Sequence, residues 1–338
     1  INVGKAKPLW KGHYQPKVPA DLGYYDLRVP EVREQQAELA RKAGVTGFLY
    51  WHYWFGNGKR LMERVFHEVL ETGKPDLPFA LAWANHSWDK KDWEGGRLHD
   101  IMLMEQTYPG EEDARQHFEF LLKAFKDERY IKVDGCPFLY IFKPDELPST
   151  YLRWFRQWAQ EAGFKDLYLV ANVWGKNTLE HYQAMGYQAV VENNMLDLLQ
   201  TKYSQMPKYT DFLFRAYRRC SQALSGKSRG AMNYREFASK VITDECKNRY
   251  VIPEIFPNWD HSPRSGRAAT AIFYNEDPDS FYEMSCDALK AIKDKPSEEQ
   301  IIILKSWNEW GEGNYMEPDL KYRHGYINAL RKAIEKSK

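Results

Sequence analysis

One stretch organises the rest of the chain: residues 301–319 read IIILKSWNEWGEGNYMEPD. Its four leading aliphatic residues do not alternate with polar ones, a pattern typical of a strand buried on both faces. Glu309 and Glu312 follow three residues apart, among tryptophans and glycines. Glycine lets the backbone turn sharply, and tryptophan offers a flat apolar face with one donor, a shape on which sugar rings stack. The stretch predicts a buried strand that leads into a functional site; the alternative is a pair of solvated loop carboxylates.

Strands of this kind alternate with helical patterns along the whole chain. They are predicted within residues 45–55, 78–88, 136–143, 167–174, 187–193, 250–260 and 301–304. Such alternation without a break in composition favours a parallel sheet in one domain over residues 1–338, with a mostly helical insertion at about 195–248. We therefore predict an α/β fold, a (β/α)8 TIM-type barrel, in which seven strands are evident and the first is missing from this chain. A doubly wound sheet is the alternative, but its glycine-rich phosphate turn is absent from the sequence.

Composition narrows the class of ligand. The net charge of +1 does not indicate a basic surface for binding nucleic acid. No apolar run approaches the length that a membrane-spanning helix needs. Aromatic residues make up 15% of the chain, with 12 Trp and 22 Tyr, many of them near predicted strand ends. The four cysteines are widely spaced without a CxxC motif, so we expect buried free thiols. We expect a carbohydrate partner, no nucleic acid and no membrane span.

The ends of the predicted strands carry the candidate site, because barrel active sites lie at the carboxyl ends of the strands. Nearly every end sets an aromatic side chain beside a hydrogen-bonding one, although each could also be buried or solvated separately. The predicted substrate-binding residues are His52, Tyr53, Trp54, Trp83, Asn85, His86, Trp88, Asn172, Trp174, Glu192, Trp259, Asp260, Arg264, Trp307, Asn308 and Trp310. Lys143, Asn193 and His261 stand at the same strand ends.

Paired carboxylates are the chemistry that the motifs favour. His52, His86 and His261 are the candidate metal ligands, with Asp260 or Glu309, but the zincin spacing HExxH is absent. The cysteines lie in predicted strands or helices without a catalytic signature around them, and we expect no covalent serine or cysteine chemistry, no metal and no other cofactor. Glu309 and Glu312 could act as a proton donor and an ionised partner. Their spacing leaves the separation open, at about 10 Å if extended or roughly 5–6 Å between β-carbons on a helical turn.

The chain resembles the WbsX-type, glycoside hydrolase family 99-like proteins in six ordered blocks. These are KPLWKGHYQPKVPADLGYYDLR (7–28), GVTGFLYWHYWF (44–55), PFALAWANHSW (78–88), YIKVDGCPFLYIF (130–142), IFPNWDHSPRSG (255–266) and SWNEWGEGNYMEPD (306–319). The resemblance implies a (β/α)8 barrel that acts on glycosidic bonds. Family 99 enzymes are retaining endo-α-mannosidases with a catalytic NEW-x-E motif, which falls on Glu309 and Glu312. The resemblance implies that Glu309 deprotonates the sugar's own 2-hydroxyl and that Glu312 is the general acid/base.

Two departures from the family pattern stand out. WbsX-like proteins usually carry a glutamate after WAN, where this chain has His86. They also begin with a strand and a tryptophan-rich loop upstream of the KPL block, whereas this chain begins at Ile1 without an initiator Met or a signal peptide. We expect either a removed leader or a piece of a longer protein, so the compartment stays open.

The leading functional hypothesis is a glycoside hydrolase that cleaves a polysaccharide or oligosaccharide with retention of configuration. One alternative is a glycosyltransferase of bacterial O-antigen or capsule polysaccharide biosynthesis, although the single DPD sequence at 277–279 fits a turn before a helix better than a nucleotide–metal motif. The other is a carbohydrate-binding barrel without catalytic activity.

Overall fold

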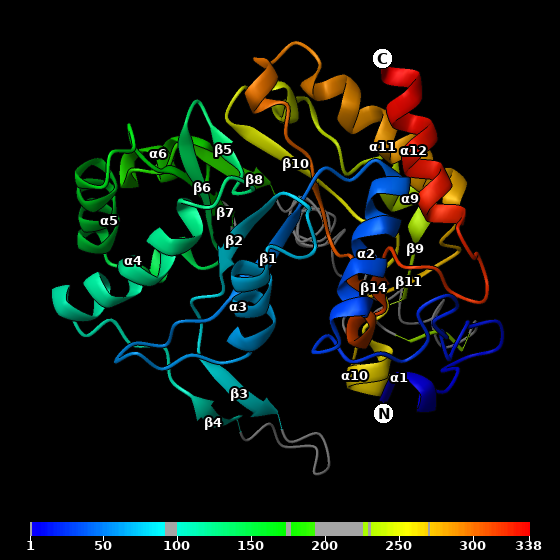
Figure 1. Ribbon diagram of the computed structural model, residues 1–338. Helices are drawn as coiled ribbons and strands as arrows, with labels where there is room; N and C mark the ends of the chain where they lie inside the picture. The colour runs from blue at the N-terminus through cyan, green and yellow to red at the C-terminus, as the bar shows by residue number, and fades with distance from the viewer. Residues whose placement is uncertain (1, 92–99, 174–176, 193–225, 229–230, 270) are drawn as a thin grey trace, which may run out of the picture.

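The computed structural model describes residues 2–91, 100–173, 177–192, 226–228, 231–269 and 271–338 (Figure 1). Its central sheet holds seven mutually parallel strands in the order β1-β2-β6-β7-β8-β10-β12. They are β1 Phe48–His52, β2 Phe79–Trp83, β6 Cys136–Ile141, β7 Tyr168–Asn172, β8 Ala189–Glu192, β10 Val251–Ile255 and β12 Ile303–Leu304. The order in the sheet follows the order in the chain, with helices between successive strands, as in a (β/α)8 TIM-type barrel. The predicted fold class and its seven strands are confirmed.

The barrel is open between β12 and β1. Among the described residues no strand lies between these two, and β12 pairs only with β10. The ring of Trp307 lies 5.5 Å from that of Phe48, so side chains make contact across the opening. The last strand is shorter and less buried than the sequence predicts. Only Ile303 and Leu304 pair, and both are half-buried because one edge of β12 lacks a neighbouring strand.

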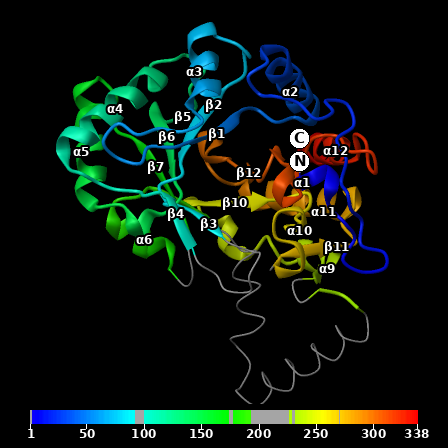
Figure 2. The same ribbon diagram turned by 90° about the horizontal axis from the view of Figure 1, so that it is seen from below.

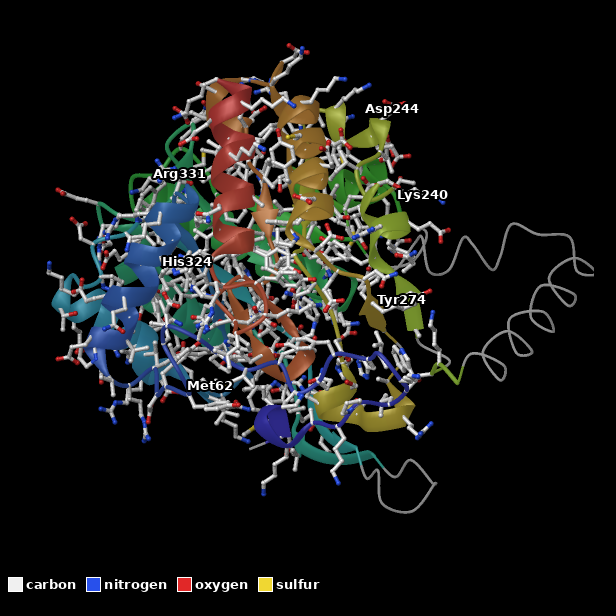
Figure 3. All side chains as sticks on the ribbon, turned by 90° about the vertical axis from the view of Figure 1, so that its right-hand side faces the viewer. Met62, Lys240, Asp244, Tyr274, His324 and Arg331 are labelled. Carbon is white, nitrogen blue, oxygen red and sulfur yellow. The ribbon has the colours of Figure 1, made fainter. Side chains whose placement is uncertain are left out.

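Helices cover the outer face of the sheet, and Figure 2 shows α3 to α6 around the outside of the first strands. The longer helices are α2 Pro30–Ala43, α3 Glu63–Thr72, α4 Glu111–Phe125, α5 Ser149–Glu161, α6 Leu179–Met185, α11 Pro278–Ile292 and α12 Gly325–Ser337. The short ones are α1 Asn2–Lys5, α9 Tyr234–Ala238 and α10 Ser262–Ser265, with 3-10 turns η1 Pro144–Glu146, η2 Asp244–Lys247, η3 Gly266–Ala268, η4 Ser297–Glu299 and η5 Trp310–Glu312. α11 and α12 lie side by side, and α12 also packs on α2 (Figures 1 and 3).

Short strand pairs extend the structure beyond the barrel. They are the antiparallel pairs β3 Trp88–Lys91 with β4 Asp100–Met104, β13 Asn308–Glu309 with β14 Asn314–Tyr315, and β5 Lys132–Val133 with β6, and the parallel pair β9 Ala231–Asn233 with β11 Ile272–Tyr274. The sequence predicted none of these pairings. The β3–β4 hairpin, α10 and α1 lie at the same end of the molecule, the lower end in Figure 1. This end carries the loops that follow the carboxyl ends of the barrel strands.

Buried side chains fill the space between the sheet and the helices. Every residue of β2, β6 and β7 is buried, and these strands pack against α4 and α5. A second cluster joins the end of β10 to α11 and α12. Full burial of one large apolar side chain stabilises the fold by roughly 1.5–3 kcal/mol, so the two clusters hold the strand ends rigidly.

Three further predictions concern the domain, the cysteines and a membrane span, and the described residues cover them only in part. The single domain over residues 1–338 stays a prediction, and residues 193–225, with most of the predicted insertion at about 195–248, lie outside the described residues. Cys136, Cys246 and Cys286 are free thiols, the first two buried; Cys220 is also outside the described part. Of the helices that the structure describes, none is long and apolar enough to cross a membrane.

Candidate active site

The two glutamates lie on one tight turn. Glu309 ends β13, η5 spans Trp310–Glu312, and β14 returns antiparallel to β13. Residues i and i+3 nearly eclipse each other in a 3-10 helix, so the turn brings both side chains to one side. Gly313 closes the turn with a left-handed φ of 56°, and a β-carbon there would lie 2.6 Å from the backbone oxygen of Asp260. Only glycine fits both this conformation and this space.

One arginine contacts both carboxylates. Arg264 in α10 places Nη1 2.6 Å from Glu312 Oε1 and Nη2 3.3 Å from Glu309 Oε1. His261 Nε2 lies 3.4 Å from the same oxygen of Glu312. The side chains of Glu309 and Glu312 are 40% and 22% exposed, so a ligand can reach both. Of the two arrangements that the spacing allows, the structure has the compact one.

The pKa values of the two carboxyls shift in opposite directions. Burial and the neighbouring charge of Glu312 raise the pKa of Glu309 above its ordinary value. Burial acts on Glu312 as well, but the hydrogen bond with His261 and the charges of His261 and Arg264 outweigh it and lower the pKa of that carboxyl. Environments that separate two carboxyls in this way assign the acid and the base. In the free protein Glu309 therefore keeps its proton to higher pH than Glu312.

Aromatic side chains of the first strand lead towards the carboxylates. Trp51 lies on the opposite face of β1 from His52 and is 43% exposed, with its ring 6.2 Å from that of Tyr140. Tyr53 follows two residues later, and its ring packs edge-on against Trp88 at 5.1 Å. Burial and the charge of Glu309 raise the pKa of Tyr53 to about 12. The hydroxyl of Tyr53 is therefore a neutral donor in the field of that carboxylate.

His86 and Phe142 continue this aromatic surface across the ends of β2 and β6. Their rings lie 5.2 Å apart, and Phe142 also meets the ring of Trp51 edge-on at 5.4 Å. His86 is half-buried.

Three of the predicted binding residues point to the helical layer instead. His52 Nε2 lies 2.8 Å from His117 Nε2 in α4, and Trp54 Nε1 donates to both oxygens of Asp113 in the same helix. The indole of Trp83 donates to the backbone oxygen of Trp54 and is fully buried. The substrate-binding role of these three side chains stays a prediction, and their present contacts are with the helices. Alternate residues of a strand face opposite sides of the sheet, and these three lie on the outer side.

Asn85 and Asp260 are also buried and fully engaged. Asn85 Oδ1 accepts from the backbone N–H of Lys143 at 2.7 Å and its amide donates to Lys143 O at 2.9 Å, which ties the ends of β2 and β6 together. Asp260 is 1% exposed and accepts hydrogen bonds from His13, Gln15 and the backbone N–H of Ser262. Their predicted role in binding stays a prediction, and in the structure both side chains are occupied by contacts within the protein.

The other predicted residues stay predictions. Trp259 and Asn172 are buried, and the Oδ1 atom of Asn172 has no hydrogen-bond partner in the described part of the chain. Glu192 is half-buried at the end of β8 and accepts from Thr243 and Cys246 at 3.4 Å. Trp307, Asn308 and Trp310 are half-buried; Trp307 packs against Phe48 and α2, and Trp310 stacks on Tyr315 at 3.7 Å. Trp174 and Asn193 lie outside the described residues.

Sequence reasoning missed Trp51, His13 and Gln15. A two-residue period starting at Tyr53 would have selected Trp51. His13 and Gln15 stand in the first block of the resemblance, where no role was attached to them. The candidate metal ligands do not converge, since His52 faces the helices. In the described ranges no group of three or more His, Cys, Asp or Glu residues could hold a metal ion.

Known proteins resemble the chain in sequence. The family model described as glycosyltransferase WbsX matches residues 1–330. Uncharacterized protein WxcX of Xanthomonas campestris pv. campestris (strain ATCC 33913) is 30% identical over 341 residues, which cover 99% of this chain and 46% of that protein. WxcX of strain B100 matches to the same extent. The chain thus spans about half the length of the curated relatives it matches.

Solved structures resemble the chain in fold. A glycoside hydrolase-like protein superposes with a TM-score of 0.59 at 17% identity, covering 94% of this chain and 89% of that one. A GH99 endo-alpha-mannosidase from Bacteroides thetaiotaomicron has a TM-score of 0.56 at 13% identity, covering 95% of this chain and 83% of that one. The same enzyme in complex with BIS-TRIS-propane has a TM-score of 0.55, covering 95% and 88%. The chain therefore has a glycoside hydrolase-like barrel fold.

Proposed function

The chain belongs to the glycosyltransferase WbsX family, and from that premise we propose that it is an enzyme acting on glycosidic bonds, with Glu309 and Glu312 as its catalytic pair. The observation that supports the proposal most directly is their shared turn, where one guanidinium meets both carboxylates. The opposite shifts of their pKa values supply a proton donor and an ionised base within one site.

The preferred reaction is hydrolysis of a polysaccharide or oligosaccharide with retention of configuration. Two carboxyls close together suit double displacement at the anomeric carbon, whereas inversion needs room between them for a water molecule. A GH99 endo-alpha-mannosidase shares the fold, which makes a sugar polymer a natural substrate to test. Tyr53, Trp88, Trp51, His86 and Phe142 would form the surface along which sugar rings lie.

The acid and base roles can be assigned to Glu309 and Glu312 in two ways. The resemblance implies that Glu309 is the base and Glu312 the acid/base. The pKa directions support the reverse assignment in the free protein, with Glu309 protonated and Glu312 ionised. We propose the reverse assignment. Glu309 protonates the leaving oxygen, while Glu312, held by His261 and Arg264, takes the proton of the sugar's 2-hydroxyl as that oxygen bonds to the anomeric carbon. Water then opens the three-membered ring at the anomeric carbon, with Glu309 taking the proton of the water and Glu312 returning the proton to the 2-oxygen.

Transfer rather than hydrolysis is the second candidate, and the description of the matching family favours it. A transferase of polysaccharide assembly uses an activated sugar donor, so a nucleoside diphosphate should bind. Calorimetry with UDP and GDP separates the two reactions. Tight binding of either supports transfer, and its absence together with release of new reducing ends supports hydrolysis.

The deciding experiment is digestion of a panel of bacterial surface polysaccharides by the full-length protein. New reducing ends are quantified, with Glu309→Gln and Glu312→Gln as controls. Cleavage by the unaltered protein that both variants abolish supports the proposal. Cleavage that survives both substitutions refutes the assignment of the pair, and binding without cleavage across the panel supports a binding barrel instead.

A further inference from the structure

A buried aspartate lies directly beneath the catalytic turn. The backbone N–H of Asp260 donates to the backbone oxygen of Glu312 at 2.9 Å. Gly313 packs so closely that its missing β-carbon would stand 2.6–3.1 Å from three atoms of Asp260. The residues after Asp260 include His261 and Arg264, the two side chains that contact the carboxylate of Glu312. The position of Asp260 thus fixes both the turn and the partners of its second glutamate.

Two side chains from the N-terminal segment hold Asp260 in place. His13 Nε2 lies 2.8 Å and Gln15 Nε2 2.6 Å from the same oxygen, Asp260 Oδ2. The second oxygen, Oδ1, accepts the backbone N–H of Ser262 at 2.9 Å. His13 and Gln15 are both buried, so water does not substitute for these bonds in the folded protein.

The backbone dictates how both donors are oriented. The backbone N–H of Leu9 donates to His13 Nδ1 at 3.0 Å, so Nδ1 is the unprotonated nitrogen and Nε2 carries the proton that faces Asp260. The backbone N–H of Lys17 donates to Gln15 Oε1 at 3.2 Å, which turns the amide nitrogen towards the aspartate. Trp10 stacks on the imidazole of His13 with ring centroids 4.1 Å apart.

The segment that carries these donors is itself anchored to the catalytic stretch. The backbone N–H of Ala20 donates to Pro318 O at 2.8 Å, and that of Leu320 donates to Val18 O at 2.9 Å. Lys17 is buried and its ammonium lies 3.4 Å from Glu276. The segment therefore runs beside the catalytic stretch as part of the same rigid unit.

We propose that His13 and Gln15 are positioning residues of the active site, which act through Asp260 to hold His261 and Arg264 against Glu312. The catalytic meaning of this role rests on the proposed function, but the positioning is measurable without any substrate. Neither side chain touches the carboxylate pair, so the effect is entirely indirect.

The test is the titration of the Glu312 carboxyl by NMR in protein labelled with carbon-13 at the glutamate side-chain carboxyls. Comparison with Glu312→Gln assigns the signal. His13→Leu and Gln15→Met each remove one donor to Asp260 without changing a formal charge. Loosened contacts from His261 and Arg264 should raise the Glu312 pKa by about half a unit to one unit. Asp260→Asn is unsuitable, because loss of its negative charge would by itself lower that pKa.

Two controls separate positioning from general loosening of the fold. His13→Gln keeps a donor that can reach Asp260 and should titrate close to the unaltered protein. Tyr130→Phe removes a buried hydroxyl that bonds the backbone of Leu81 and Phe138 within the sheet. It should leave the Glu312 titration unchanged although it also costs stability.

Each outcome decides for or against the proposal. A raised Glu312 pKa in His13→Leu and Gln15→Met, but not in the controls, supports it. An unchanged value in both folded variants overturns it, as does an equal shift in Tyr130→Phe. If His13→Leu fails to fold, Gln15→Met decides alone. A shifted Glu312 pKa in a protein that cleaves no polysaccharide counts against the proposed hydrolysis and leaves the positioning intact.

Discussion

Gly311 leaves space for the carboxylate of Glu309: a β-carbon at Gly311 would lie 3.2 Å from Glu309 Oε1 and 3.5 Å from Arg264 Nη2. The first contact is tighter than ordinary packing, so the Glu309 carboxylate would have to move by a few tenths of an ångström, whereas the second is an ordinary van der Waals contact. The absence of a side chain at this position therefore leaves room for the carboxylate of Glu309 in its observed position.

Gly311→Ala should slow catalysis without unfolding the protein. The φ of Gly311 is not in the left-handed region, so alanine fits the backbone, and its methyl group displaces the carboxylate of Glu309. Small displacements of reacting groups cost up to about 100-fold in rate, and we expect a loss of about tenfold in kcat. Activity and the melting temperature are measured together. Normal kcat in the variant would mean that Glu309 needs no fixed position.

Glu309→Gln and Glu312→Gln should each lower kcat by about 10²- to 10⁴-fold, the range for loss of a general acid or base. If Glu309 is the acid, Glu309→Gln recovers much of its rate on an aryl glycoside whose nitrophenol leaves without protonation, and Glu312→Gln does not. If Glu312→Gln recovers on the aryl glycoside and Glu309→Gln does not, then Glu312 is the acid and Glu309 the base, as the resemblance implies. Circular dichroism checks that both variants fold.

Arg264→Gln should move the pH optimum upwards. The positive charge of Arg264 lowers the pKa of both Glu309 and Glu312, so its removal raises both. Since Glu312 must be ionised and Glu309 protonated, the acid limb and the alkaline limb of kcat/KM both shift to higher pH, by about half a unit to one unit. Arg264→Lys keeps the charge and should shift less. Limbs that stay in place would show that these two carboxyls do not control the rate.

Trp51→Ala should weaken substrate binding more than stability. The side chain is 43% exposed, so its removal costs little burial, whereas loss of a stacking face should lower kcat/KM about tenfold. The matched control is Trp83→Ala, which deletes a fully buried indole and should cost about 3–5 kcal/mol of stability. KM and chemical denaturation are measured for both. A Trp51→Ala protein with unchanged KM would remove Trp51 from the binding surface.

Stability should fall as the pH drops below about 6.5, the ordinary pKa of histidine. Burial lowers the pKa of His52 to about 3 and that of His117 well below its ordinary value. Between these values the unfolded chain binds protons that the folded protein excludes. Each group thus removes up to about 1.4 kcal/mol per pH unit, and the loss ends as the pH falls through the folded pKa.

His117→Phe tests this account, because it removes one of the two excluded protons and keeps an aromatic ring beside Trp54. Urea denaturation of the variant between pH 7 and 5 should show a shallower decline than the unaltered protein. Equal slopes would mean that the acid sensitivity arises elsewhere.

The barrel was predictable from the sequence because buried parallel strands are recognisable as unbroken apolar runs. It could not predict which aromatic residues face the site. In residues 50–55 every side chain is aromatic or histidine, so no contrast between polar and apolar positions marks the two faces of β1. The prediction accordingly chose His52 and Trp54, which face the helices, and passed over Trp51.

The carboxylate pair was predictable for the opposite reason. Glu309 and Glu312 are neighbours in sequence, and glycines and tryptophans around them mark a turn. Their separation and their pKa shifts were not predictable, since both depend on His261 and Arg264 from another loop. Polar side chains in an irregular segment, such as His13 and Gln15, carry no periodic signal that reports their burial.

The bonds beneath the catalytic turn also determine when the site forms. His13 and Asp260 are separated by 247 residues, and Gln36 and Glu317, which hydrogen-bond at 2.6 Å, by 281. Contacts this distant in sequence must overcome a large loop-closure entropy and form late in folding. During synthesis the strands from β1 to β8 emerge before residues 260–317. Under the proposed function, activity therefore depends on contacts that form late in folding.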